Sequence, residues 1–190
     1  MLELAALGLL QHENLHGYRL KQQLELFMSS CVSVNYGTIY PLLKRLEERG
    51  AIAVLTDAEG EGGSQRKMYS ITPEGKLLWR QKMLEYPHES WVNSRSRFLI
   101  KFLFFSYLEP AERIKLLQYR LMVCQLRLEN REMRQPLSSD PHNTKLWAYC
   151  GTELQREIEW LQEQLLHEQT AQPSKDTLLL MASSSDLSSS

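Results

Sequence analysis

The chain has 190 residues, of which 43% are hydrophobic and 24% are charged, values typical of one large or two small folded domains. This composition excludes a wholly disordered or collagen-like protein, and three cysteines without a C-x-x-C pair argue against a zinc ribbon or a disulfide scaffold. The formal net charge of −1 gives the whole molecule no electrostatic attraction to nucleic acid. Because no apolar run approaches the roughly 18 residues of a spanning helix and the N-terminus lacks signal-peptide features, we expect a cytoplasmic protein without membrane contact.

The first part of the chain predicts three short helices. Residues 2–10 are almost all apolar, which indicates a buried helix. A second helix is expected from residue 16 to about residue 27. A third is expected from Ser33, a good N-cap residue, to Arg49, with Gly50 ending it.

A β-hairpin and a fourth helix follow. Residues 51–56 and 66–72 predict two strands, and the Gly- and Glu-rich segment 57–65 predicts the loop between them. Thr72 and Pro73 have the residue types of an N-cap and a first helical position. Three helices, a two-stranded wing and a helix form a winged helix-turn-helix, which we assign to residues 1–86 of a mainly α chain.

The third helix has one apolar face and one face suited to a phosphate backbone. Its apolar residues are expected in the core: Ile39, Leu42, Leu43 and Leu46. On the other face, Gly37 permits close approach, Tyr40 can donate a hydrogen bond, and Lys44 adds a positive charge. Pro41 is unexpected inside a helix, because it should remove one hydrogen bond at about 3 kcal/mol and leave the Gly37 carbonyl free. The alternative is a solvated face that happens to hold tyrosines.

The charge of residues 1–86 leaves a second function open. This segment contains 10 Lys and Arg and 10 Asp and Glu, and the wing loop is acidic although Arg66 and Lys67 lie at its base. A basic wing base can contact the adjacent minor groove, but a strongly basic footprint is absent. The alternative is therefore a protein–protein interaction module built on a winged helix.

Residues 87–168 predict long helices at about 89–105, 110–134 and 143–167. The last two carry near-heptad apolar stripes that predict packing against another helix, in a homodimer or, alternatively, in an intramolecular hairpin. The stripe residues assigned to dimerisation are Leu117, Leu121, Cys124, Leu128, Leu154, Ile158, Leu161 and Leu165. The Ser-rich segment 169–190 predicts a disordered tail.

Other features of the sequence point to weaker hypotheses. Aromatic residues of the second region suggest either a cavity for a small apolar effector or ordinary core packing. Arg95, Arg97 and Lys101 form a small basic stripe that is expected in solvent. A redox role for Cys31, Cys124 or Cys150 lacks a feature that would lower a thiol pKa.

A zinc-enzyme pattern is also present and is disfavoured. His12 and His16 fit H-E-x-x-H, yet Asn14 and Gly17 bracket the second histidine in a turn, and no third ligand follows at the required distance. We therefore predict no catalytic residues, no metal and no cofactor.

Several blocks of residues 1–86 occur together in order and with matching gaps. They are Leu7-Gly-Leu-Leu10, His16-Gly-Tyr-Arg-Leu20, Gly37-Thr-Ile-Tyr-Pro-Leu-Leu-Lys-Arg-Leu-Glu47, Gly50 and Tyr69-Ser-Ile-Thr-Pro-Glu-Gly75. With these blocks the segment resembles the PadR family of bacterial transcriptional regulators. Residues 87–168 are similar in length and texture to the virulence-activator-type C-terminal helices of the longer members.

The resemblance implies a homodimeric winged-helix protein that binds palindromic operators in double-stranded DNA, usually as a repressor. It also implies where DNA is contacted: Tyr18, Lys21, Tyr36, Thr38, Tyr40, Lys44, Arg66 and Lys67. The acidic wing departs from the more basic wings expected in the family.

Overall fold

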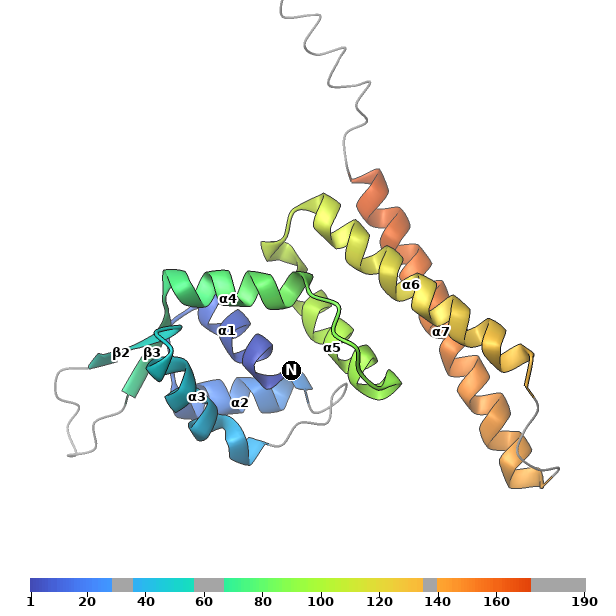
Figure 1. Ribbon diagram of the computed structural model, residues 1–190, viewed down its shortest axis with the longest axis horizontal. Helices are drawn as coiled ribbons and strands as arrows, with labels where there is room; N and C mark the ends of the chain where they lie inside the picture. The colour runs from blue at the N-terminus through green and yellow to red at the C-terminus, as the bar shows by residue number, and fades with distance from the viewer. Residues whose placement is uncertain (29–35, 57–66, 135–139, 172–190) are drawn as a thin grey trace, which may run out of the picture. The chain divides into compact units, whose positions relative to one another are not determined.

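The structure is a computed structural model that describes residues 1–28, 36–56, 67–134 and 140–171. The chain divides into two compact units, Met1–Tyr107 and Leu108–Ser190 (Figure 1). The first unit thus extends beyond residue 86, the domain boundary expected from the sequence. Among the residues described, no helix combines the length and the hydropathy that a membrane span requires.

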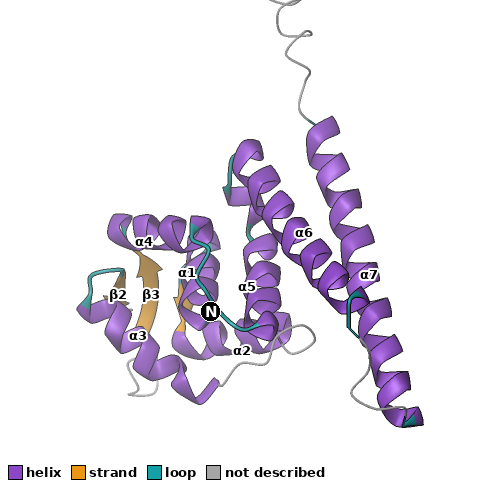
Figure 2. Cartoon of the chain, turned by 45° about the vertical axis from the view of Figure 1, so that its right-hand side comes forward, coloured by secondary structure: helices purple, strands orange, loops and turns teal. Residues whose placement is uncertain are grey.

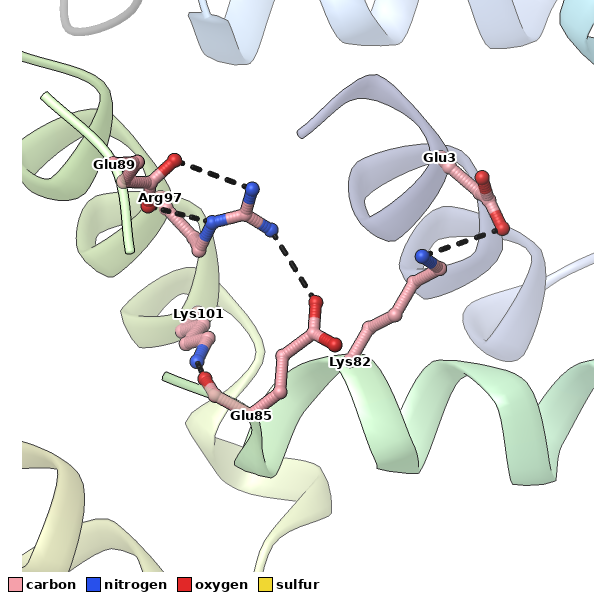
Figure 3. Close-up of polar contacts among 6 residues, drawn as sticks. All are labelled: Glu3, Lys82, Glu85, Glu89, Arg97 and Lys101. Atoms are coloured by element: carbon pink, nitrogen blue, oxygen red, sulfur yellow. Dashed lines mark hydrogen bonds and ion pairs between the residues drawn. The ribbon is translucent and has the colours of Figure 1, made fainter. Parts of the chain in front are cut away.

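The winged-helix part of the first unit contains α1 (Leu2–His12), α2 (Gly17–Met28), α3 (Ile39–Glu48) and α4 (Pro73–Leu84). Helix α1 is deeply buried, with every residue from Leu4 to Leu10 inside the core, as its apolar sequence predicts. It packs against α4, where Lys82 Nζ lies 3.6 Å from the carboxylate of Glu3 (Figure 3). The apolar face predicted for α3 is buried as well.

A small antiparallel sheet lies among these helices (Figure 2). Its strands are β1 (Leu15–His16), β2 (Ile52–Thr56) and β3 (Lys67–Ile71), in the order β1-β3-β2. The β2–β3 hairpin confirms the predicted wing strands. Strand β1 is additional, because two residues are too short to show an alternating pattern. It also separates His16 from His12 in α1, whereas the zinc pattern needs both histidines on one helix.

The two ends of α3 account for the positions of Pro41 and Gly50. The 3-10 turn η1 (Tyr36–Thr38) precedes α3, so Pro41 is the third residue of the helix. The cost of about 3 kcal/mol for a helix interior therefore does not apply, because Pro41 lies in the first turn of α3, where proline is tolerated. At the other end Gly50 has φ +69°, and the bonds Gly50 N–H to Glu47 O and Ala51 N–H to Leu46 O form a Schellman motif.

Helix α5 (Trp91–Leu103) is held to the end of α4 by a polar cluster (Figure 3). Arg97 Nε donates to Glu89 Oε1 at 2.7 Å, and its Nη1 lies 3.6 Å from Glu85 Oε1. Lys101 Nζ donates to the backbone carbonyl of Glu85, and only 4% of Lys101 is exposed. The expectation that Arg97 and Lys101 lie in solvent is therefore wrong.

The aromatic residues of α5 and η2 (Phe105–Tyr107) pack against each other and against α4. The ring centroids of Phe102 and Phe105 are 4.8 Å apart, and those of Trp79 and Phe104 are 6.4 Å apart. These contacts agree with the core-packing alternative for this part of the aromatic set. The small apolar effector stays a prediction.

The second unit contains α6 (Pro110–Glu132) and α7 (Pro141–Thr170), which pack along each other as an antiparallel hairpin (Figure 1). Arg120 Nη2 of α6 lies 2.7 Å from Glu157 Oε1 of α7, and Arg120 is only 2% exposed. Of the tail predicted from residue 169, residues 172–190 lie outside the described ranges, and α7 itself continues to Thr170.

The residues assigned to dimerisation lie on these two helices. Some are buried within a single chain: Leu117, Cys124, Leu154, Ile158 and Leu161. The others, Leu121, Leu128 and Leu165, are partly exposed. Their position agrees with the hairpin alternative, and a direct role in dimerisation stays a prediction.

Candidate nucleic-acid interface

Helices α2 and α3 present polar and aromatic side chains to solvent, while most of their leucines, Leu26 excepted, are buried. Tyr18 on α2 is 62% exposed and Tyr40 on α3 is 55% exposed. The side chain of Lys44, one turn after Tyr40, is 77% exposed. Since Ile39, Leu42, Leu43 and Leu46 are 5% exposed or less, α3 is amphipathic as the sequence predicts, with its polar face in solvent.

The basic residues of this surface are only weakly paired. Lys21 Nζ lies 3.5 Å from Glu25 Oε1, and Lys44 Nζ lies 3.9 Å from Glu48 Oε1. Both are pairs four residues apart on exposed helix faces, and such pairs contribute well under 1 kcal/mol. Either ammonium group can therefore exchange its carboxylate for a phosphate at little cost.

The hydroxyl of Tyr18 has a defined neighbour on its own helix. Gln22 Nε2 donates to Tyr18 Oη at 3.2 Å, which leaves the tyrosine O–H available as a donor to a ligand. Gln22 is not among the contact residues predicted from the sequence. The spacing of four residues is the only sequence signal for it, since i and i+4 share a helix face.

Tyr40 lies against the beginning of α2. A Cβ built on Gly17 would be 3.2 Å from Tyr40 Cε1 and 3.4 Å from Tyr69 Cε2, so both rings cover this glycine. Tyr69 is buried at 7% exposure, and burial raises the pKa of its hydroxyl, with Glu47 and Tyr40 adding to the rise. The rings of Tyr40 and Tyr69 therefore both lie close to Gly17, and the phenol of Tyr69 is kept neutral by the raised pKa.

Of the other residues predicted to contact DNA, the structure describes the side chains of some and not of others. Thr38 is exposed at the N-cap of α3, and Lys67 is exposed at the start of β3. Tyr36 lies in η1, but its side chain is outside the described residues, as is the whole of Arg66. Five of the predicted contact residues thus lie on two helices. Tyr18 and Lys21 lie on α2, Thr38 is the N-cap of α3, and Tyr40 and Lys44 lie within α3.

Comparison with known proteins gives matches that include the winged-helix part of the chain. Residues 6–81 match the family model described as the transcriptional regulator PadR-like family. Over 131 residues, which are 68% of this chain and 70% of the relative, the sequence is 29% identical to the negative transcriptional regulator PadR of Bacillus subtilis (strain 168).

Two solved structures of Bacillus subtilis PadR are also similar to the chain. The complex with operator DNA is 25% identical, covers 88% of this chain and 98% of its own, and has a TM-score of 0.44. The complex with p-coumaric acid is 23% identical, covers 88% and 95%, and has a TM-score of 0.40.

Proposed function

We propose that this chain is a homodimeric, sequence-specific DNA-binding repressor, since residues 6–81 match the family model of the PadR-like transcriptional regulators. One observation carries the proposal. The winged helix buries the leucines of α3 and exposes Tyr40 and Lys44 on the opposite side, and it also exposes Tyr18 of α2. This is the surface that a recognition helix needs to enter a major groove.

The residues of this surface have separate roles in the proposed complex. Lys44 neutralises a phosphate and releases counterions, which strengthens binding to any sequence. The hydroxyls of Tyr18 and Tyr40 donate to phosphate oxygens and fix the register of α3 on the duplex. Thr38, at the N-cap, lies beside the positive end of the α3 dipole, where an anion is favoured. Lys67, exposed at the start of β3, extends the contact toward the wing. Contacts of Arg66 and Tyr36 with DNA are proposed from the sequence alone.

Dimerisation doubles this surface, which matters because the segment 1–86 has no net charge. Five of the eight stripe residues are already buried within one chain, so contact between copies also involves other side chains of the hairpin. Met122 and Leu126 of α6 are 46% and 49% exposed, and Met133 at the end of α6 is 82% exposed. Their spacings of four and seven residues place them on one helix face, as in a helix–helix interface.

The negative role is supported by the name of the relative from Bacillus subtilis, a negative transcriptional regulator. A dimer with twofold symmetry places two α3 helices in successive major grooves. The operator is then an inverted repeat with half-sites about one helical turn, about 10 base pairs, apart. The protein works in the cytoplasm, where the bacterial chromosome lies, and occupation of the operator blocks transcription.

A mobility-shift titration of the DNA upstream of the gene tests the proposal at two salt concentrations. We expect a retarded complex whose log Kd rises steeply with log salt concentration, and Tyr40→Phe should weaken it while leaving thermal unfolding unchanged. Saturable binding to the upstream DNA should survive an excess of unrelated duplex. Absence of any complex at low salt would favour the protein–protein interaction module instead.

A further inference from the structure

We propose that Gly17 is a positioning residue, which sets the place of Tyr40 on the DNA-binding surface because any side chain at position 17 would displace the Tyr40 ring. The inference rests on the proposed DNA-binding function. It adds a residue that does not itself reach the duplex.

Gly17 is the first residue of α2 and is buried, so it is not available for contact with DNA. The atoms that cover it belong to Tyr40 of α3, Tyr69 of β3 and Leu43 of α3, at 3.2, 3.4 and 3.6 Å from the position of a Cβ. Residues of α3 and β3, which are distant from α2 in the sequence, therefore meet α2 at a position where glycine has no side chain. The tightest of these contacts is made by Tyr40, the residue that is more than half exposed.

The backbone of Gly17 does not itself require glycine. Its φ lies outside the left-handed region, in contrast to Gly50 at +69°. Alanine is also the better helix former by about 1 kcal/mol. By backbone conformation alone, Gly17→Ala should therefore stabilise α2, and only the space taken by the covering side chains opposes it.

The response of the neighbours to an added methyl group differs. Tyr69 and Leu43 are buried, at 7% and 1% exposure, and have little room to move. Tyr40 is 55% exposed and can turn outward. Cε1 of Tyr40 is next to the carbon that carries the hydroxyl, so a shift at this contact moves the proposed phosphate donor directly.

The test is a double-mutant cycle of Gly17→Ala and Tyr40→Ala, with affinity measured on the upstream DNA. Gly17→Ala alone should weaken binding about threefold to tenfold, as for the removal of one hydrogen bond. In the Tyr40→Ala background the same change should have no further effect, because the ring that it displaces is gone. An equal decrease in affinity in both backgrounds would overturn the proposal.

A measurement without DNA separates this inference from the proposed function. In protein with labelled tyrosines, Gly17→Ala should shift the ring signals of Tyr40 and Tyr69 and leave those of Tyr119 and Tyr149 in place. Gly151→Ala, the same change in α7, is the matched control and should shift neither Tyr40 nor Tyr69. Unmoved Tyr40 signals would overturn the proposal even if the chain binds DNA, whereas moved signals in a chain that binds no duplex would contradict the proposed function alone.

The same cycle distinguishes local crowding from a general folding defect. If Gly17→Ala lowers the melting temperature, Tyr40→Ala added to it should restore the temperature to that of the single Tyr40→Ala variant, since the crowding is relieved. A melting temperature that stays low in the double variant would place the strain elsewhere and overturn the proposal.

Discussion

Lys44 lies on the exposed side of α3, and the carboxylate with which it pairs, that of Glu48, is 3.9 Å away and itself exposed. We expect Lys44→Ala to weaken binding to all duplexes by a similar factor, because a phosphate contact carries no sequence information. The slope of log K against log salt concentration should fall by about 0.9 for each phosphate that is no longer neutralised. Lys76→Ala, which removes an exposed lysine of α4, is the control and should leave the slope unchanged. An unchanged slope for Lys44→Ala would remove Lys44 from the interface.

Lys101 shows that composition does not tell which charges are buried. The pKa of its ammonium group is lowered to about 8, mainly by burial and also by the charge of Arg97, while Glu85 and Glu89 oppose the effect (Figure 3). Its place on the inner face of α5 follows from no simple sequence pattern, because the carbonyl of Glu85 that receives its hydrogen bond comes from the end of another helix.

This burial predicts a pH dependence of stability. The pKa of Lys101 is lower in the folded chain than its ordinary value of 10.5, so the folded state binds fewer protons between about pH 8 and pH 10.5, and stability rises with pH over this range. Relative to Lys101→Met, the wild-type chain should gain up to about 3 kcal/mol between pH 7 and pH 10.5. Urea unfolding at both pH values measures this, and a constant difference between the two proteins would contradict it.

At the scale of elements, α3 is the helix whose predicted end agrees with the structure while its predicted beginning does not. The sequence predicts its apolar face and its end at Gly50, because leucine spacing and a C-terminal glycine are local signals. It misplaces the beginning of α3, because residues 36–38, which the sequence predicts to be α-helical, form the 3-10 turn η1. Pro41 is therefore in the first turn of α3 and not in its interior. The short strand β1 is not predicted because it is defined by its partner β3, which lies far along the chain.

The position of Pro41 is open to a direct test. If Pro41 were inside a helix, its replacement by alanine would stabilise the chain by about 3 kcal/mol. As the third residue of α3, it occupies a position whose amide has no intrahelical acceptor, so we expect Pro41→Ala to change the free energy of unfolding by about 1 kcal/mol or less. Chemical denaturation decides between the two values, and a gain near the larger one would mean that the helix begins before η1.

For the whole molecule, the sequence indicates two parts, and the structure also has two compact units. The boundary differs because α5 is tied to α4 through Arg97 and Lys101, which are contacts between segments that no local pattern reports. The exposure of Tyr40 and Lys44 at the candidate interface follows from helical periodicity, and their contact with DNA stays a prediction. The approach of Tyr40 and of Tyr69 of β3 to Gly17 of α2 becomes visible only when distant elements are brought together.

The proposed dimer gives a prediction at this scale. Leu126→Glu places a charge on the exposed stripe of α6 and should convert the dimer to monomer without unfolding the hairpin, because Leu126 is 49% exposed. Sedimentation equilibrium measures the change, and circular dichroism checks the helix content. Gln125→Glu, at the neighbouring exposed position, is the control. A Leu126→Glu protein that remains dimeric would show that another surface joins the copies.

The proposal that α3 of each of two chains recognises one half of a symmetric operator is tested most directly by selecting bound duplexes from a random pool with the full chain. We predict enrichment of an inverted repeat whose half-sites are centred about 10 base pairs apart. Tyr40→Phe and Lys44→Ala proteins should recover the same repeat less efficiently. A pool without an enriched sequence, or with an enriched sequence that lacks twofold symmetry, would contradict the account.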